Sequence, residues 1–133
     1  MNRPELAETP HKAPAAAPLV QRALSFLEMG DPAGAQLLLD THFLRSPDDA
    51  DALNLQGVLH RRGGRLDEAL ESFTRAAAIK PADPLFAVNL AGVLGDLGRG
   101  PDALNVIDAF LVRSPGQADA LIQRTLLLAR MGR

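Results

Sequence analysis

Three histidines are the side chains best suited to bind a metal or move a proton near neutral pH: His11, His42 and His60. Their separations fit neither H-E-x-x-H nor another ligand spacing, and the chain has no cysteine to supply a thiolate. Four serines lie outside any nucleophile elbow, at positions 25, 46, 72 and 114. The sequence therefore predicts no metal site, no cofactor and no catalytic residue.

Two further patterns resemble catalytic motifs only superficially. Gly92, Gly95 and Gly98 have the spacing of a phosphate loop, but it is also a helical spacing. No strand pattern precedes them and no G-K-[ST] follows. Asp67 and Glu68 stand at the start of a helical pattern, where carboxylates complement the helix dipole. We therefore predict that the chain is not an enzyme.

The composition excludes several other classes of protein. A net charge of −2 lacks the basic surplus of a nucleic-acid binder, so no nucleic-acid partner is expected. No run of about 18 apolar residues is present, so no membrane span is expected. Residues 1–17 contain Glu5, Glu8 and several prolines, which predicts a disordered Pro/Ala-rich leader and no secretory signal. Together with the lack of cysteine, this predicts a cytoplasmic location.

The elements that must position any site follow a fixed period of 34 residues. Four types of residue recur at this period along the chain. They are a small residue (Ala23, Gly57, Ala91, Thr125), a glycine (Gly30, Gly64, Gly98, Gly132), an alanine (Ala35, Ala69, Ala103) and a proline (Pro47, Pro81, Pro115). The small residue and the alanine let two helices approach closely. The glycine suits a left-handed helix end, and the proline ends the second helix.

Helix signals complete the pattern. Asp31-Pro32 and Asp83-Pro84 are typical of an N-cap followed by the first helical residue. Apolar residues between these signals have a helical spacing. The sequence predicts an all-α fold with seven helices at about 18–29, 32–45, 50–62, 66–79, 84–97, 101–113 and 118–131.

These repeats resemble the tetratricopeptide repeat (TPR) family. The middle repeat carries the matching residues, which are Ala50, Leu53, Gly57, Gly64, Leu66, Ala69, Phe73, Ala76 and Pro81. The resemblance implies a right-handed solenoid of helix-turn-helix units over residues 18–133, with repeats 16–49, 50–83 and 84–117 and a half repeat at 118–133. The sequence departs from the family at His42 and Phe110, which replace a normally small residue of the second helix.

The resemblance implies a protein-interaction scaffold that binds a peptide or partner helix in a concave groove lined by the first helix of each repeat. Positions matching the groove lining are Val20, Leu24, Asn54, Val58, Arg61, Arg62, Leu85, Val88, Asn89, Gly92, Asp96, Ile122, Gln123, Leu126 and Arg130. As groove residues, the asparagines would bond a ligand backbone, the glycine would admit it closely and the arginines would pair with a carboxylate. Packing between repeats for Asn89, and an ordinary solvated helix end for the arginines, remain open alternatives.

The last helix is expected to carry an exposed interface at Leu127 and Leu128. Exposed leucines of this kind favour either a homodimer through the half repeat or a longer protein. In the second case the chain is the non-catalytic N-terminal arm of a bacterial glycosyltransferase- or sulfotransferase-type enzyme. TPR arrays with the GC-rich bacterial character of this sequence often precede such domains.

Overall fold

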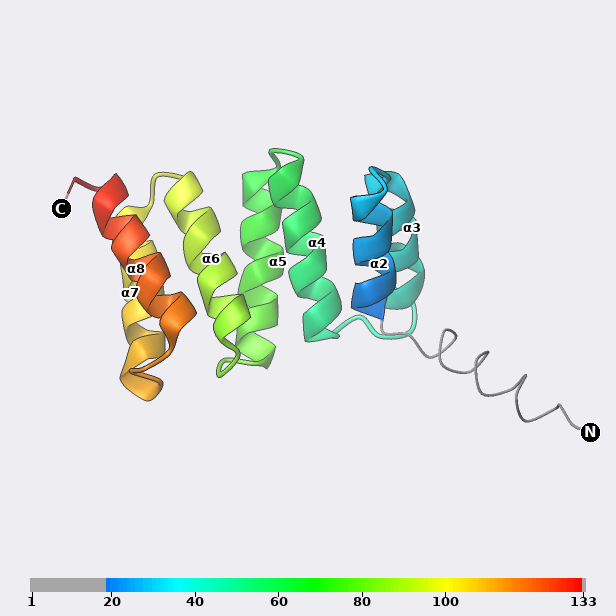
Figure 1. Ribbon diagram of the computed structural model, residues 1–133. Helices are drawn as coiled ribbons and strands as arrows, with labels where there is room; N and C mark the ends of the chain where they lie inside the picture. The colour runs from blue at the N-terminus through cyan, green and yellow to red at the C-terminus, as the bar shows by residue number, and fades with distance from the viewer. Residues whose placement is uncertain (1–18, 133) are drawn as a thin grey trace, which may run out of the picture. The chain divides into compact units, whose positions relative to one another are not determined.

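The computed structural model describes residues 19–132, and within them every regular element is an α-helix. The helices are α2 (Leu19–Glu28), α3 (Pro32–Phe43), α4 (Ala50–Arg62), α5 (Leu66–Ile79), α6 (Pro84–Asp96), α7 (Gly100–Arg113) and α8 (Ala118–Arg130) (Figure 1). The seven predicted helices and the all-α fold class are confirmed. The predicted leader at residues 1–17 lies outside the described residues.

The chain divides into two compact units, Met1–Arg45 and Ser46–Arg133. In the described part of the first unit, α2 and α3 form one helix hairpin. Its core contains Ala23, Ala35 and Leu39, all without exposed surface. Asp31 caps α3 by accepting a hydrogen bond from the Gly34 amide at 2.9 Å, as the Asp-Pro signal predicts.

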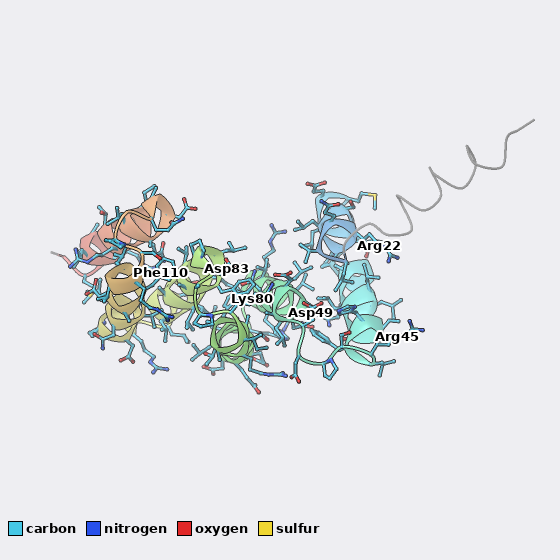
Figure 2. All side chains as sticks on the ribbon, turned by 90° about the horizontal axis from the view of Figure 1, so that it is seen from below. Arg22, Arg45, Asp49, Lys80, Asp83 and Phe110 are labelled. Carbon is cyan, nitrogen blue, oxygen red and sulfur yellow. The ribbon has the colours of Figure 1, made fainter. Side chains whose placement is uncertain are left out.

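The second unit contains the hairpins α4–α5 and α6–α7, followed by α8. The first helices of successive repeats contact one another, α4 with α6 and α6 with α8. Asp49 and Asp83 cap the first turns of α4 and α6. Figure 2, an end-on view, labels both caps and Lys80, the C-cap of α5, whose Nζ lies 3.6 Å from Oδ2 of Asp51 in the first turn of α4. The end of α5 therefore lies beside the start of α4.

The turn inside each hairpin depends on the periodic glycine. Gly64 has φ +77°, a left-handed conformation that costs other residues about 1 kcal/mol or more. This conformation lets the Arg65 amide donate to the His60 carbonyl at 2.8 Å, which satisfies one of the open acceptors at the end of α4. The equivalent glycines at positions 30, 98 and 132 have φ 76–77° as well, so the predicted role of this column is confirmed.

The small-residue columns place a large ring between two helices. Gly57 on α4 leaves space for the Phe73 ring of α5, which is completely buried beside Ala69. The same arrangement is not kept in the next repeat, where Phe110 of α7 and the alanines Ala87 and Ala91 belong to one core cluster. The large ring has changed position, while the hairpin is preserved.

One expectation about α8 is wrong. Leu127 is only 1% exposed, because it packs into the core cluster with Leu94 and lies against Gly95 of α6. Leu128 is half-buried against the same cluster. The large apolar side chains of α8 that are exposed are instead Leu121, Ile122 and Leu126, with 44%, 59% and 54% of their surface accessible.

Candidate protein-binding groove

Two asparagines connect the first helices of successive repeats. The Asn89 side-chain amide of α6 donates to the Asn54 carbonyl oxygen of α4 at 3.0 Å. Asn54 is only 7% exposed and Asn89 is half-buried. Burying amide groups is costly unless they are hydrogen-bonded, so this pair stabilises the contact between the two helices. Between the alternatives for Asn89, the structure supports packing between repeats.

Asp96 forms a second connection that reaches three helices. Its carboxylate, at the end of α6, accepts from Arg61 Nε of α4 at 2.5 Å and from Arg130 Nη1 of α8 at 3.4 Å. Burial raises the pKa of the Asp96 carboxyl, but the hydrogen bonds and charges of Arg61 and then Arg130 outweigh burial and hold that pKa below its ordinary value. Asp96 is therefore ionised at neutral pH, and two cations share one anion.

The two glycines of α6 make room for these arginines. A Cβ at Gly92 would lie 2.9 Å from Arg61 Nη1 and 3.3 Å from Gln123 Nε2. A Cβ at Gly95 would lie 3.1 Å from Arg130 Nη1, whose Nη2 donates to the Gly95 carbonyl at 3.1 Å. The backbone of α6 is thus covered by long flexible side chains, and a ligand reaches it only if they move.

A hollow of about 440 Å³ opens beside these arginines. Its lining comes from α4 and α8, with Arg61, Gln123, Leu126, Leu127, Ala129 and Arg130. Elsewhere on the first helices, Leu85 of α6 is 54% exposed, and Val58 of α4 and Val88 of α6 are half-buried. The surface combines aliphatic side chains with a cationic end, which suits a partner that is apolar and carries acid groups.

Most of the predicted groove residues of the second unit lie together on α4, α6 and α8. Asn54, Arg61, Asn89, Gly92, Asp96 and Gln123 are in contact with another member of this set or lie against it. Arg62 is exposed, and its guanidinium makes no hydrogen bond or ion pair with any residue in the range 19–132. Val20 and Leu24 belong to the first unit, where Val20 is half-buried and Leu24 is 41% exposed.

The sequence interpretation missed that these polar residues bind one another. The pairs Arg61–Asp96 and Asn54–Asn89 are each separated by 35 residues, one more than the repeat, and so is Arg130 from Gly95. The sequence signal that could have revealed these pairs is the presence of complementary polar residues 35 positions apart. Because these donors and acceptors already have partners, a ligand must compete for them.

His60 lies in the last turn of α4 and is hydrogen-bonded within the protein, while His11 lies outside the described residues. Arg65 Nε donates to His60 Nδ1 at 3.1 Å. Burial lowers the pKa of the His60 imidazole, the charge of Arg65 lowers it further, and Glu68 and Glu71 oppose this. Within residues 19–132 no group of three or more His, Asp or Glu could hold a metal ion. None of the helices in that range is long and apolar enough to cross a membrane.

Successive helix hairpins whose first helices pack side by side and form one surface are typical of helical-repeat proteins. Residues 20–84 match the tetratricopeptide repeat family. The chain is therefore a tetratricopeptide repeat protein, and the resemblance of its sequence is confirmed.

Solved structures support this assignment. A tetratricopeptide repeat protein from Parabacteroides merdae ATCC 43184 matches with 28% identity and TM-score 0.73, over 86% of this chain and 46% of that one. A thermophilic TPR protein of Thermus thermophilus matches with 21% identity and TM-score 0.75, over 86% and 64%. An O-GlcNAc transferase mutant from Thermobaculum terrenum matches with 23% identity and TM-score 0.73, over 96% and 23%.

The chain spans 46% to 64% of the first two of these structures. No curated protein matches the chain significantly.

Proposed function

We propose that the chain is a non-catalytic scaffold that binds a segment of another protein along α4, α6 and α8. The observation that carries this proposal is the exposed aliphatic pair Ile122 and Leu126, at 59% and 54%, beside the arginine-lined hollow. Leaving large aliphatic side chains in water forgoes about 1.5–3 kcal/mol of burial each, and exposed apolar patches rimmed by polar residues mark interaction sites.

The charges at this end of the groove favour a partner with acidic groups. Arg61 and Arg130 share the single carboxylate of Asp96, and the neighbouring Arg62 is exposed outside this hydrogen-bonded group. A carboxylate of the partner would find donors on Arg62 and on the second arginine that shares Asp96. The partner segment is therefore aliphatic and acidic, and it is a protein segment rather than nucleic acid, because a chain with a net charge of −2 lacks the basic surplus of a nucleic-acid binder.

The test compares a groove variant with a surface control. Ile122→Glu and Leu126→Glu together place two charges in the groove and should remove partners captured from a lysate of the source cells. Val112→Glu is the matched control, because Val112 is 83% exposed on α7 and lies outside the groove. Identical sets of captured proteins for wild type, control and groove variant, with unchanged far-UV circular dichroism, would refute groove binding.

A second candidate is the recruiting arm of a longer glycosyltransferase- or sulfotransferase-type enzyme. The likeness to an O-GlcNAc transferase, of which this chain covers only 23%, favours it. Reading the coding sequence beyond the codon of Arg133 tests it: a stop codon there contradicts the arm, and a continuing frame with a transferase domain supports it.

A homodimer through α8 is a separate proposal. Leu121, Thr125 and Leu128 occupy the positions that in α6 are Ala87, Ala91 and Leu94, all of which are buried under α7. In α8, Leu121 is 44% exposed, so a second copy could cover this stripe. Sedimentation tests it, and a strict monomer at tens of micromolar contradicts it.

A further inference from the structure

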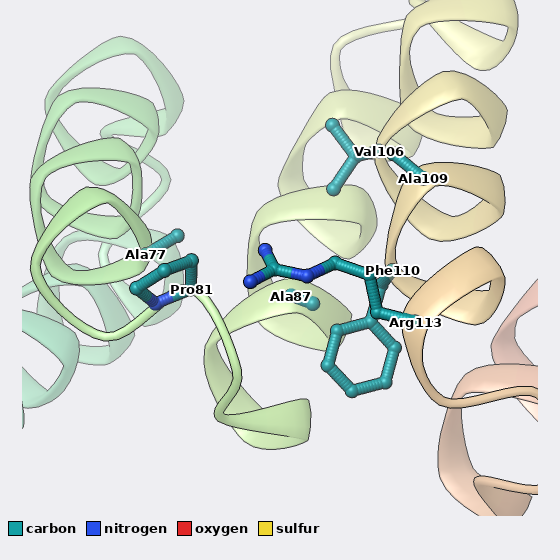
Figure 3. A pocket seen from close by; sticks show the side chains of 7 residues that line it. All are labelled: Ala77, Pro81, Ala87, Val106, Ala109, Phe110 and Arg113. Atoms are coloured by element: carbon teal, nitrogen blue, oxygen red, sulfur yellow. The ribbon is translucent and has the colours of Figure 1, made fainter.

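A second hollow lies away from the proposed groove, over α6 and between α5 and α7. Its volume is about 260 Å³, and it is lined by Ala77, Pro81, Ala87, Val106, Ala109, Phe110 and Arg113 (Figure 3). An apolar cavity of about 150 Å³ is large enough to hold benzene, so this space is large enough for one aliphatic side chain. It is also open to solvent on one side, which gives a ligand access.

Small residues create this hollow at this place in the repeat. Ala77, Ala87 and Ala109 stand where the preceding repeat, 34 residues earlier, has Phe43, Leu53 and Arg75. Each replacement removes side-chain atoms. Phe110, which replaces the usual small residue, is 5% exposed and forms part of the floor. The sequence interpretation noted Phe110 as a departure from the family but did not connect it with three neighbouring alanines.

Arg113 is the one charged residue in the lining. Figure 3 shows its guanidinium extending toward Ala77 and Pro81, across the hollow. Throughout residues 19–132, no side chain or carbonyl forms a hydrogen bond or ion pair with the Arg113 guanidinium. The lining contains no carboxylate that could neutralise it. The hollow therefore combines apolar walls with an unpaired cation, which complements an aliphatic group bearing a carboxylate.

We propose that this hollow binds the C-terminus of a partner chain that ends in an aliphatic residue. A terminal residue carries its side chain and its carboxylate on the same Cα. Its side chain can therefore fill the hollow while its carboxylate reaches Arg113. An internal segment fits less well, because none of the other lining side chains has a hydrogen-bonding group for its amides. The site is independent of the α4–α6–α8 groove and does not rest on the function proposed for that groove.

The experiment is an NMR titration of the ¹⁵N-labelled full chain with N-acetyl-leucine and, separately, with N-acetyl-leucinamide. A fragment of this size should bind with a Kd on the order of millimolar. We expect the acid to shift the amide signals of Ala77, Ala87 and residues 106–113, and to bind up to about fivefold more tightly than the amide.

Three variants make the result decisive. Arg113→Gln should remove the preference for the acid, while Arg22→Gln, which changes an exposed arginine on α2 outside both proposed sites, should leave it unchanged. Ala77→Leu introduces the residue that the next repeat has at Leu111, and filling the hollow should abolish binding of both probes. The spectrum of each variant reports whether it is folded.

Equal affinity for the two probes, an acid preference that survives Arg113→Gln, or no shifts at tens of millimolar would each overturn the proposal. Shifts confined to α4 and α8 would also overturn it, and would place the aliphatic acid in the groove instead. Failure of the groove experiment on Ile122 and Leu126 has no bearing on this outcome, so the two proposals are tested separately.

Discussion

Gly57 offers the sharpest test of how the repeat is packed. A Cβ at this position on α4 would lie 2.6 Å from Cδ1 and Cε1 of Phe73 and 2.9 Å from Cζ. The ring has no exposed surface, so it has no free space into which to move. We predict that Gly57→Ala destabilises the protein although alanine is the better helix former.

The magnitude follows from two opposing effects. Replacing glycine with alanine inside a helix favours folding by about 1 kcal/mol. Overpacking a well-filled core costs about 1–3 kcal/mol. The net effect of Gly57→Ala is therefore a loss of roughly 0–2 kcal/mol in the free energy of unfolding. Gly92→Ala is the matched comparison, since its Cβ would meet the mobile ends of Arg61 and Gln123, and it should stabilise by up to about 1 kcal/mol.

The assay is urea unfolding followed by far-UV circular dichroism on both variants. A further pair, Phe73→Leu alone and with Gly57→Ala, removes the ring that causes the conflict. In the Phe73→Leu background, Gly57→Ala should be neutral or stabilising, which gives a coupling energy of about 1–3 kcal/mol between the two sites. If Gly57→Ala stabilises the wild type as much as Gly92→Ala does, the reasoning about the ring is refuted.

Three further predictions concern single residues. Gly64→Ala should lower the unfolding free energy by about 1–2 kcal/mol in a urea titration, from backbone strain alone, because φ is +77° and no atom lies within 4 Å of the added Cβ. Leu127→Ala should lower the free energy of unfolding by about 2–5 kcal/mol because Leu127 is buried, and Leu126→Ala by at most about 0.5 kcal/mol because Leu126 is exposed. Equal losses for the two variants would contradict the burial of Leu127. The pKa of the Asp96 carboxyl is lower in the folded protein than in the unfolded chain. Its ion pairs therefore contribute up to about 1 kcal/mol to the free energy of unfolding above the unfolded pKa of about 3.9, and this contribution is lost as the pH falls through the folded pKa. Asp96→Asn should lack this part of the pH dependence when unfolding is measured from pH 7 to pH 2.

Local signals in the sequence were sufficient for the helices and their ends. Asp31 and Asp83 cap helices as predicted, and Gly64 adopts the left-handed conformation that its place in the period indicates. Each of these features depends on interactions within about four residues along the chain. For the same reason, the bounds of the helices differ from the predicted ones by two residues at most.

The neighbours of each side chain across repeats were harder to predict. Leu127 was expected on an exposed end, yet it faces α6, because the rotation of α8 about its axis is set by packing against Gly95 and the core. For Asn89 the sequence leaves ligand binding and packing between repeats open, and for Arg61 ligand binding and a solvated helix end; in the structure they bind Asn54 and Asp96. A periodic pattern identifies equivalent positions, but contacts between non-equivalent positions depend on how the helices are stacked.

The polar connections between α4, α6 and α8 also have a mechanical consequence. Asn89–Asn54 and Asp96 with Arg61 and Arg130 join these helices on one surface. In a solenoid each repeat contacts only its neighbours, so such ties determine how stiffly this surface resists stretching. Arg61 is about one-third exposed, and its ion pair is weakened by salt. This surface should therefore become easier to stretch as ionic strength rises. A partner carboxylate that binds Arg130 in place of Asp96 would loosen the contact between α6 and α8.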